Sequence, residues 1–198
     1  VPVWVDGMID VATAIHASHP NYLTKALSKS LLKDDGENPF TSEWFRPVKG
    51  RELRESIVMD GSPCIVLATS GMLNGGPVME YFKNWAHEER NSLCFVGYQA
   101  EGTLGRRLQK GFGEVPMLIN GKTEIVKIGC EMVTIDGFSG HSDRRQLLDF
   151  VDRINPPPKN IICHHGDYQK CNELGLTLRE RYNCLTFAPS NLETVRLF

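Results

Sequence analysis

From residue 64 to residue 110 the chain repeats one pattern of an apolar run, a glycine-bearing loop and an amphipathic stretch. The apolar runs, residues 64–68 and 93–96, show no polar alternation, which is typical of strands buried on both faces. Helical periodicity follows at residues 78–86 and 103–110. Strands that alternate with helices predict an α/β fold whose parallel sheet is flanked by helices on both sides.

The segment before residue 64 fits the same architecture. A short apolar strand is predicted at residues 3–5, followed by a helix at residues 8–17. A second helix is expected to start at Pro20 and to continue to Leu31, because proline is well tolerated in a first turn. A third helix is predicted at residues 51–57.

The pattern changes after Gly113. Asn120-Gly121, the dipeptide that favours a type I′ turn, predicts a β-hairpin between strands at residues 117–119 and 124–128. We therefore expect two parts, residues 1–113 and residues 114–198. Further strands are predicted at residues 130–135, 160–163 and 194–197, and helices at residues 144–154 and 170–182.

Composition narrows the class of protein. A net charge of -2 and a pI near 6.3 exclude nucleic-acid binding through bulk positive charge but leave a local basic groove open. Six cysteines without C-x-x-C pairs indicate buried free thiols. No run approaches the roughly 20 apolar residues of a membrane span. We expect a cytoplasmic protein, and the start without methionine suggests a piece of a longer chain.

A glycine-rich loop at residues 69–77 is the first candidate site. Gly71, Gly75 and Gly76 would let backbone N–H groups approach an anion at a helix start. The loop does not match G-x-x-x-x-G-K-[ST], so a nucleoside-triphosphate site is not expected. A tight strand-to-helix turn explains the glycines equally well.

A second candidate is the start of the helix predicted after Gly102. Thr103 offers a hydroxyl, and Arg106 and Arg107 follow one turn later. Such a group could hold a phosphodiester. An exposed helix face with solvated arginines is the alternative.

Two histidine-bearing phrases follow apolar strands. His164 and His165 are neighbours, and neighbours in an extended segment point opposite ways, so at most one faces a given site. In the other phrase Asp143 could orient the His141 ring or cap the next helix. Such positions suit metal ligands and general acids.

Taken together, four motifs resemble the β-CASP branch of the metallo-β-lactamase superfamily, and the likeness covers essentially the whole chain. It is closest to the archaeal homologues of the endonuclease subunit of cleavage and polyadenylation specificity factor. The motifs are residues 70–73, 97–105, 139–143 and 165–167.

The resemblance implies a zinc-dependent ribonuclease with two zinc ions in its cleft, acting in RNA 3′-end processing or decay as an endonuclease, with 5′ exonuclease action as the second activity. It implies that His141 is a proton donor or a transition-state partner and that His165 is a zinc ligand. Asp143 is expected beside His141 in the catalytic site. RNA contacts opposite these histidines are expected from Ser70, Gly71, Met72, Gly102, Thr103 and Arg106.

The chain departs from the family pattern in one respect: it lacks the H-x-H-x-D-H motif that supplies most zinc ligands. A single histidine cannot hold zinc tetrahedrally. We therefore expect residues 1–113 to be the β-CASP domain and residues 114–198 the C-terminal part of the lactamase domain, inactive and zinc-free alone. The alternative is a non-catalytic module that binds RNA or forms a homodimer through its C-terminal segment.

Overall fold

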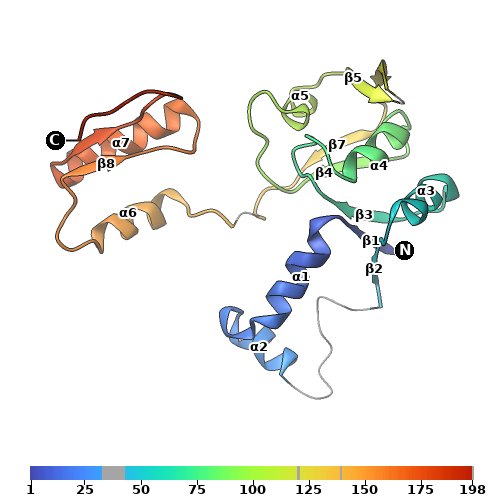
Figure 1. The fold of residues 1–198 in the computed structure, drawn as a ribbon, viewed down its shortest axis with the longest axis horizontal. Helices are drawn as coiled ribbons and strands as arrows, with labels where there is room; N and C mark the ends of the chain where they lie inside the picture. The colour runs from blue at the N-terminus through green and yellow to red at the C-terminus, as the bar shows by residue number, and fades with distance from the viewer. Residues whose placement is uncertain (33–42, 120, 139, 198) are drawn as a thin grey trace. The chain divides into compact units, whose positions relative to one another are not determined.

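The computed structural model describes residues 1–32, 43–119, 121–138 and 140–197, and the chain divides into two compact units (Figure 1). The first unit is Val1–Ser139 and the second is Gly140–Phe198. Both units contain small parallel sheets and helices, so the α/β class predicted from the sequence is confirmed. No helix in the described ranges is long and apolar enough to cross a membrane.

The first unit contains a three-stranded parallel sheet in the order β2-β1-β3. Its strands are β1 (Val3–Asp6), β2 (Phe45–Pro47) and β3 (Ile65–Ala68). A second parallel pair joins β4 (Ser92–Phe95) to β7 (Glu131–Thr134). The parallel strands expected from the apolar runs are present, whereas β2 was not predicted because its three residues are all exposed.

In the described part of the first unit, the α-helices are α1 (Met8–Ser18), α2 (Lys25–Leu31), α3 (Arg51–Asp60), α4 (Val78–Trp85) and α5 (Leu104–Gln109). The prediction of one helix from Pro20 is wrong. Pro20–Tyr22 forms a single 3-10 turn, Leu23 is extended, and Thr24 caps a new helix by accepting a hydrogen bond from the Leu27 N–H. The side-chain cap explains where α2 begins.

The predicted β-hairpin is β5 (Glu114–Ile119) paired antiparallel with β6 (Lys122–Lys127). Asn120 of the predicted turn lies outside the described residues, and Gly121 has a φ of 77°. The hairpin packs into the core of the first unit. The buried members of that core are Leu73, Phe82, Ala86, Phe95, Leu108, Val115, Met117, Val126 and Cys130. Packing therefore joins the hairpin to the first unit, and the family boundary expected after Gly113 stays a prediction.

One face of the parallel strands is open. Ile65 and Leu67 of β3 and Cys94 of β4 are exposed, because no described helix covers them. The expectation of a sheet covered on both faces is therefore wrong for this part of the chain.

All six cysteines are free, and Cys130, Cys163 and Cys184 are the buried ones.

The second unit is a β-α-β unit preceded by a helix. Its elements are α6 (Arg144–Asp152), β8 (Asn160–Ile162), α7 (Tyr168–Tyr182) and β9 (Leu185–Phe187). β8 and β9 are parallel, and Val151, Cys163 and Leu178 form the buried core.

The strand predicted at residues 194–197 is wrong, and β9 takes its place beside β8. Asn183, in a left-handed conformation, ends α7 and turns the chain back. The Cys163 N–H then donates to the Phe187 carbonyl oxygen at 2.8 Å. Near the C-terminus, the Leu197 carbonyl oxygen accepts a hydrogen bond from the Asn160 side-chain amide of β8.

Candidate functional site

In the second unit, side chains at both ends of α6 hold it against α7. At the start of α6, the Arg144 guanidinium donates to Thr177 Oγ1 at 2.5 Å. At its end, Asp152 accepts a hydrogen bond from the Tyr182 hydroxyl at 2.6 Å. Arg144 precedes Asp152 along α6, and Thr177 precedes Tyr182 along α7, so the two helices run in the same direction.

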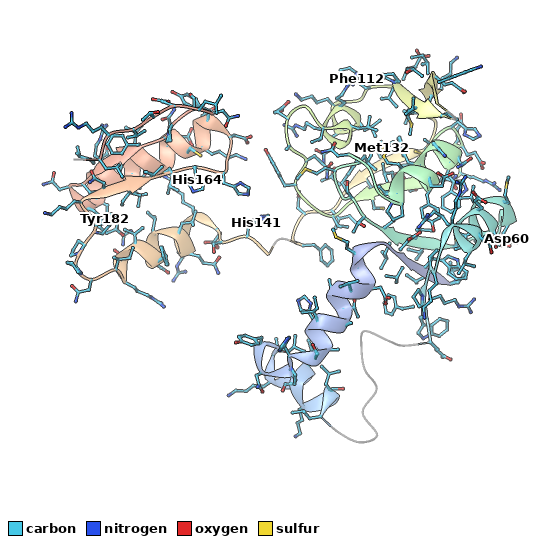
Figure 2. The ribbon with its side chains drawn as sticks, viewed as in Figure 1. Asp60, Phe112, Met132, His141, His164 and Tyr182 are labelled. Carbon is cyan, nitrogen blue, oxygen red and sulfur yellow. The ribbon has the colours of Figure 1, made fainter. Side chains whose placement is uncertain are left out.

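This parallel arrangement brings the two histidine phrases to the same end of the second unit. His141 lies just before α6, and His165 lies between β8 and α7. Figure 2 labels His141 and His164, the chain neighbour of His165. Both histidines are exposed. His165 has a φ of 64°, which is uncommon for a residue with a side chain and occurs in turns as well as at functional sites.

Asp143 caps α6. Its carboxylate accepts a hydrogen bond from the Gln146 N–H at 2.8 Å, and the Gln146 side chain accepts one from the Asp143 N–H at 2.9 Å. This reciprocal pair is a capping box, which satisfies two N–H groups at the helix start. Of the two roles left open by the sequence, the cap is observed; the orientation of His141 stays a prediction.

The described residues do not provide a complete set of metal ligands. In the described part of the chain, no three His, Cys, Asp or Glu side chains gather closely enough to hold a metal ion. Zinc sites in proteins use three or four protein ligands. The residues present therefore do not fit a complete zinc site, and His165 can supply only one donor to it.

In the first unit, the glycine-rich loop at residues 69–76 is a tight turn. The Ser70 N–H donates to the Gly75 carbonyl oxygen, and the Leu73 N–H donates back to the Ser70 carbonyl oxygen. A Cβ on Gly76, which has a φ of 77°, would lie 2.8 Å from the Thr69 carbonyl oxygen. These hydrogen bonds and the close backbone approach at Gly76 show that the tight turn is formed, while binding of an anion by the glycine N–H groups stays a prediction.

The two loops that the sequence singled out lie against each other. The Gly105 N–H donates to the Met72 carbonyl oxygen at 3.2 Å. The Gln99 side-chain amide donates to the Gly71 carbonyl oxygen at 2.9 Å. The structure thus brings residues 70–72 together with residues 102–106. Gln99 was not singled out, because a glutamine in a polar loop carries no sequence signal of burial.

At the helix start after Gly102, Thr103 and Arg106 bond mainly to neighbouring residues of the same segment. Buried Thr103 donates its hydroxyl to the Ala100 carbonyl oxygen at 2.7 Å and accepts from the Arg106 N–H. The Arg106 guanidinium pairs with Glu101 at 3.1 Å. Hydrogen bonds from Lys110 and then from Arg106 lower the pKa of Glu101. Arg106 is therefore a partly exposed but partly neutralised cation.

Family models match both parts of the chain. The Beta-Casp domain matches residues 1–108, and the Zn-dependent metallo-hydrolase RNA specificity domain matches residues 125–189. The first match alone covers more than half of the chain. The chain therefore belongs to the β-CASP branch of the metallo-β-lactamase superfamily, as its motifs indicated.

Curated archaeal relatives named transcription termination factor FttA match along the chain. Identity is 54% over 198 residues for the Methanosarcina mazei protein, of which the chain covers 31%. It is 48% over 198 residues for the Pyrococcus horikoshii protein, of which it covers 30%. The Methanocaldococcus jannaschii protein is 46% identical over 197 residues. The chain thus spans about a third of its relatives' length.

Proposed function

We propose that this chain is part of a zinc-dependent ribonuclease that cuts RNA as an endonuclease. The observation that carries the proposal is the parallel pairing of α6 with α7, which sets His141 and His165 at one end of the second unit. The match to a Zn-dependent metallo-hydrolase RNA specificity domain supports the same activity. In its relatives' full length, the remaining zinc ligands would come from outside this chain.

His141 acts in this proposal as the general acid. Cleavage of a phosphodiester leaves a charged oxygen, and an imidazole can protonate it near neutral pH. The exposed position of His141, at a bend before α6, allows a substrate to approach the ring. Asp143, while capping α6, also keeps the backbone next to His141 in place.

His165 acts as one zinc ligand. Its left-handed backbone conformation is one that surrounding structure must maintain, which supports a role that depends on the direction of the ring. Because the described residues supply too few further ligands, we expect this chain alone to be inactive.

The loops of the first unit contact RNA in this proposal. Ser70, Gly71 and Met72 lie beside Gly102, Thr103 and Arg106, and Arg106 supplies a cation for phosphate. The relatives are named transcription termination factors. We infer that the RNA is a transcript, which agrees with a role in forming RNA 3′ ends.

The test uses the longer protein that contains this chain. His141→Ala should lower RNA cleavage by about 10²- to 10⁴-fold while zinc content and RNA affinity stay unchanged. His165→Ala should lower both cleavage and zinc content. His164→Ala is the matched control, because its side chain neighbours His165 without the proposed role.

Two results would count against the ribonuclease. Cleavage that survives His141→Ala removes the general acid. RNA binding without cleavage by the unmodified longer protein, loaded with zinc, would favour the non-catalytic RNA-binding module instead.

A further inference from the structure

Gln99 is the polar side chain that links the two loops of the first unit. It is only 2% exposed. Its Nε2 donates to the carbonyl oxygens of Gly71, at 2.9 Å, and Gly97, at 3.1 Å. Since both partners are acceptors, the amide nitrogen must face them, and both of its hydrogens are used.

The oxygen of the same amide faces Gly105. Oε1 is buried and has no hydrogen-bond partner within the described part of the chain. A Cβ on Gly105 would lie 1.8 Å from Oε1 and 2.8 Å from Cδ of Gln99. Only glycine at this position leaves room for the amide. Gly105 also donates its N–H to Met72, so the residue that accommodates Gln99 is itself bonded to the neighbouring loop.

Leu73 fixes the same loop from the side of the core. It has a φ of 57°, a left-handed conformation that is unusual for a branched side chain, and its side chain is buried among the core residues of the unit. Such strain persists only when surrounding contacts enforce it. The Gln99 amide on Gly71 is such a contact, two residues away.

We propose that Gln99 is a positioning residue that holds residues 70–72 and 102–106 together as one RNA-contacting surface. Gly105 is glycine because it must admit the Gln99 amide. The buried oxygen without a partner costs stability, and the two bonds made by the nitrogen offset that cost only in this arrangement of the loops. The inference rests on the proposed function, in which these loops contact RNA.

The first test replaces the amide with a side chain of similar length. In the longer protein, Gln99→Met should weaken binding of a labelled single-stranded RNA of mixed sequence by about ten-fold, because two hydrogen bonds to the loops are lost. The matched control is Asn91→Leu, which removes a side-chain amide bonded to the Trp85 carbonyl oxygen at 3.1 Å, away from the loops. Its RNA affinity should stay within about two-fold of the unmodified protein.

The second test displaces the amide without changing it. Gly105→Ala should weaken RNA binding as much as Gln99→Met does. In a Gln99→Ala background, where the obstructing amide is gone, Gly105→Ala should have little further effect. The Phe95 ring, 3.2 Å from the same Cβ position, needs only a small shift. Additive effects of the two substitutions would overturn the proposal.

Hydrogen exchange provides a readout that does not depend on RNA. Gln99→Met should speed exchange of the Gly105 N–H, which is bonded to Met72, and the Asn91→Leu control should not. Unchanged exchange at Gly105, or faster exchange with unchanged RNA affinity, would overturn the role of Gln99. If the unmodified longer protein binds no RNA, the proposed function fails instead.

Discussion

The carboxylate of Asp6 accepts two hydrogen bonds from the Arg54 guanidinium, with Nε–Oδ2 and Nη2–Oδ1 distances of 2.7 and 2.9 Å. The Tyr81 hydroxyl donates to the same carboxylate at 2.8 Å. Asp6 is buried at the end of β1, and its carbonyl oxygen accepts from the Thr69 N–H. The buried cluster of Asp6, Arg54 and Tyr81 is therefore bonded, through the Asp6 carbonyl oxygen, to the start of the loop at residues 69–76.

Breaking the buried pair should destabilise the first unit. Arg54→Met leaves the Asp6 charge buried without its main partner, and we expect a loss of about 3 kcal/mol in the free energy of unfolding. Urea titration measures it. Arg51→Met is the control, because the Arg51–Glu55 pair is exposed and screened by solvent and should change the free energy of unfolding little. Equal losses for the two variants would contradict the role of the cluster.

The same pair should make stability sensitive to acid. Burial by itself raises the pKa of Asp6, but hydrogen bonds from Arg54 and Tyr81 outweigh it and hold the pKa below the ordinary value of 3.8. The contribution is complete above the pKa of the unfolded chain and is lost as pH falls through the lowered folded value. Between pH 5 and pH 2, the unfolding free energy of the unmodified chain should fall more steeply than that of Asp6→Asn. Parallel curves would argue against it.

Arg106 should account for part of the salt dependence of RNA binding. Arg106→Ala should weaken binding and reduce the slope of log affinity against log salt by about 0.7, as expected for one phosphate contact on a single strand. Glu101→Gln should strengthen binding, because it removes the carboxylate that pairs with Arg106. Arg90→Ala, at an exposed arginine outside both loops, serves as the control. An unchanged slope in Arg106→Ala would remove this residue from the RNA surface.

Zinc binding by the 198-residue chain tests whether this chain by itself contains enough zinc ligands. After dialysis against buffered zinc, we expect less than one tightly bound ion per chain by atomic emission, because His165 lacks enough companions in the described ranges. The longer protein, treated in the same way, should retain zinc. Stoichiometric tight zinc in the shorter chain would refute the prediction.

Self-association through the C-terminal segment can be tested at Leu192. This side chain is fully exposed and its backbone has a φ of 66°, so it presents an apolar tip to solvent. If the segment forms a homodimer contact, Leu192→Asp should shift sedimentation toward the monomer, whereas Glu193→Gln should not. A monomeric unmodified protein, or a dimer insensitive to Leu192→Asp, would exclude this contact.

Local sequence patterns predicted most of the elements. The apolar runs located β3 and β4, and Asn120-Gly121 located the hairpin, because these signals depend on residues close in sequence. The strand prediction near the C-terminus failed because strand pairing depends on distant segments. Residues 185–187 form a strand because they pair with β8, whereas residues 194–197 are not part of a strand in the described chain.

By itself, the sequence determined the α/β class, the family and the histidine phrases, because motifs and periodicity are properties of neighbouring residues. Only the tertiary structure decided that α6 and α7 run in parallel and that Gln99 is buried between two loops. A polar side chain is solvated or holds a loop according to which distant residues the fold places beside it. Local sequence patterns do not identify those distant residues.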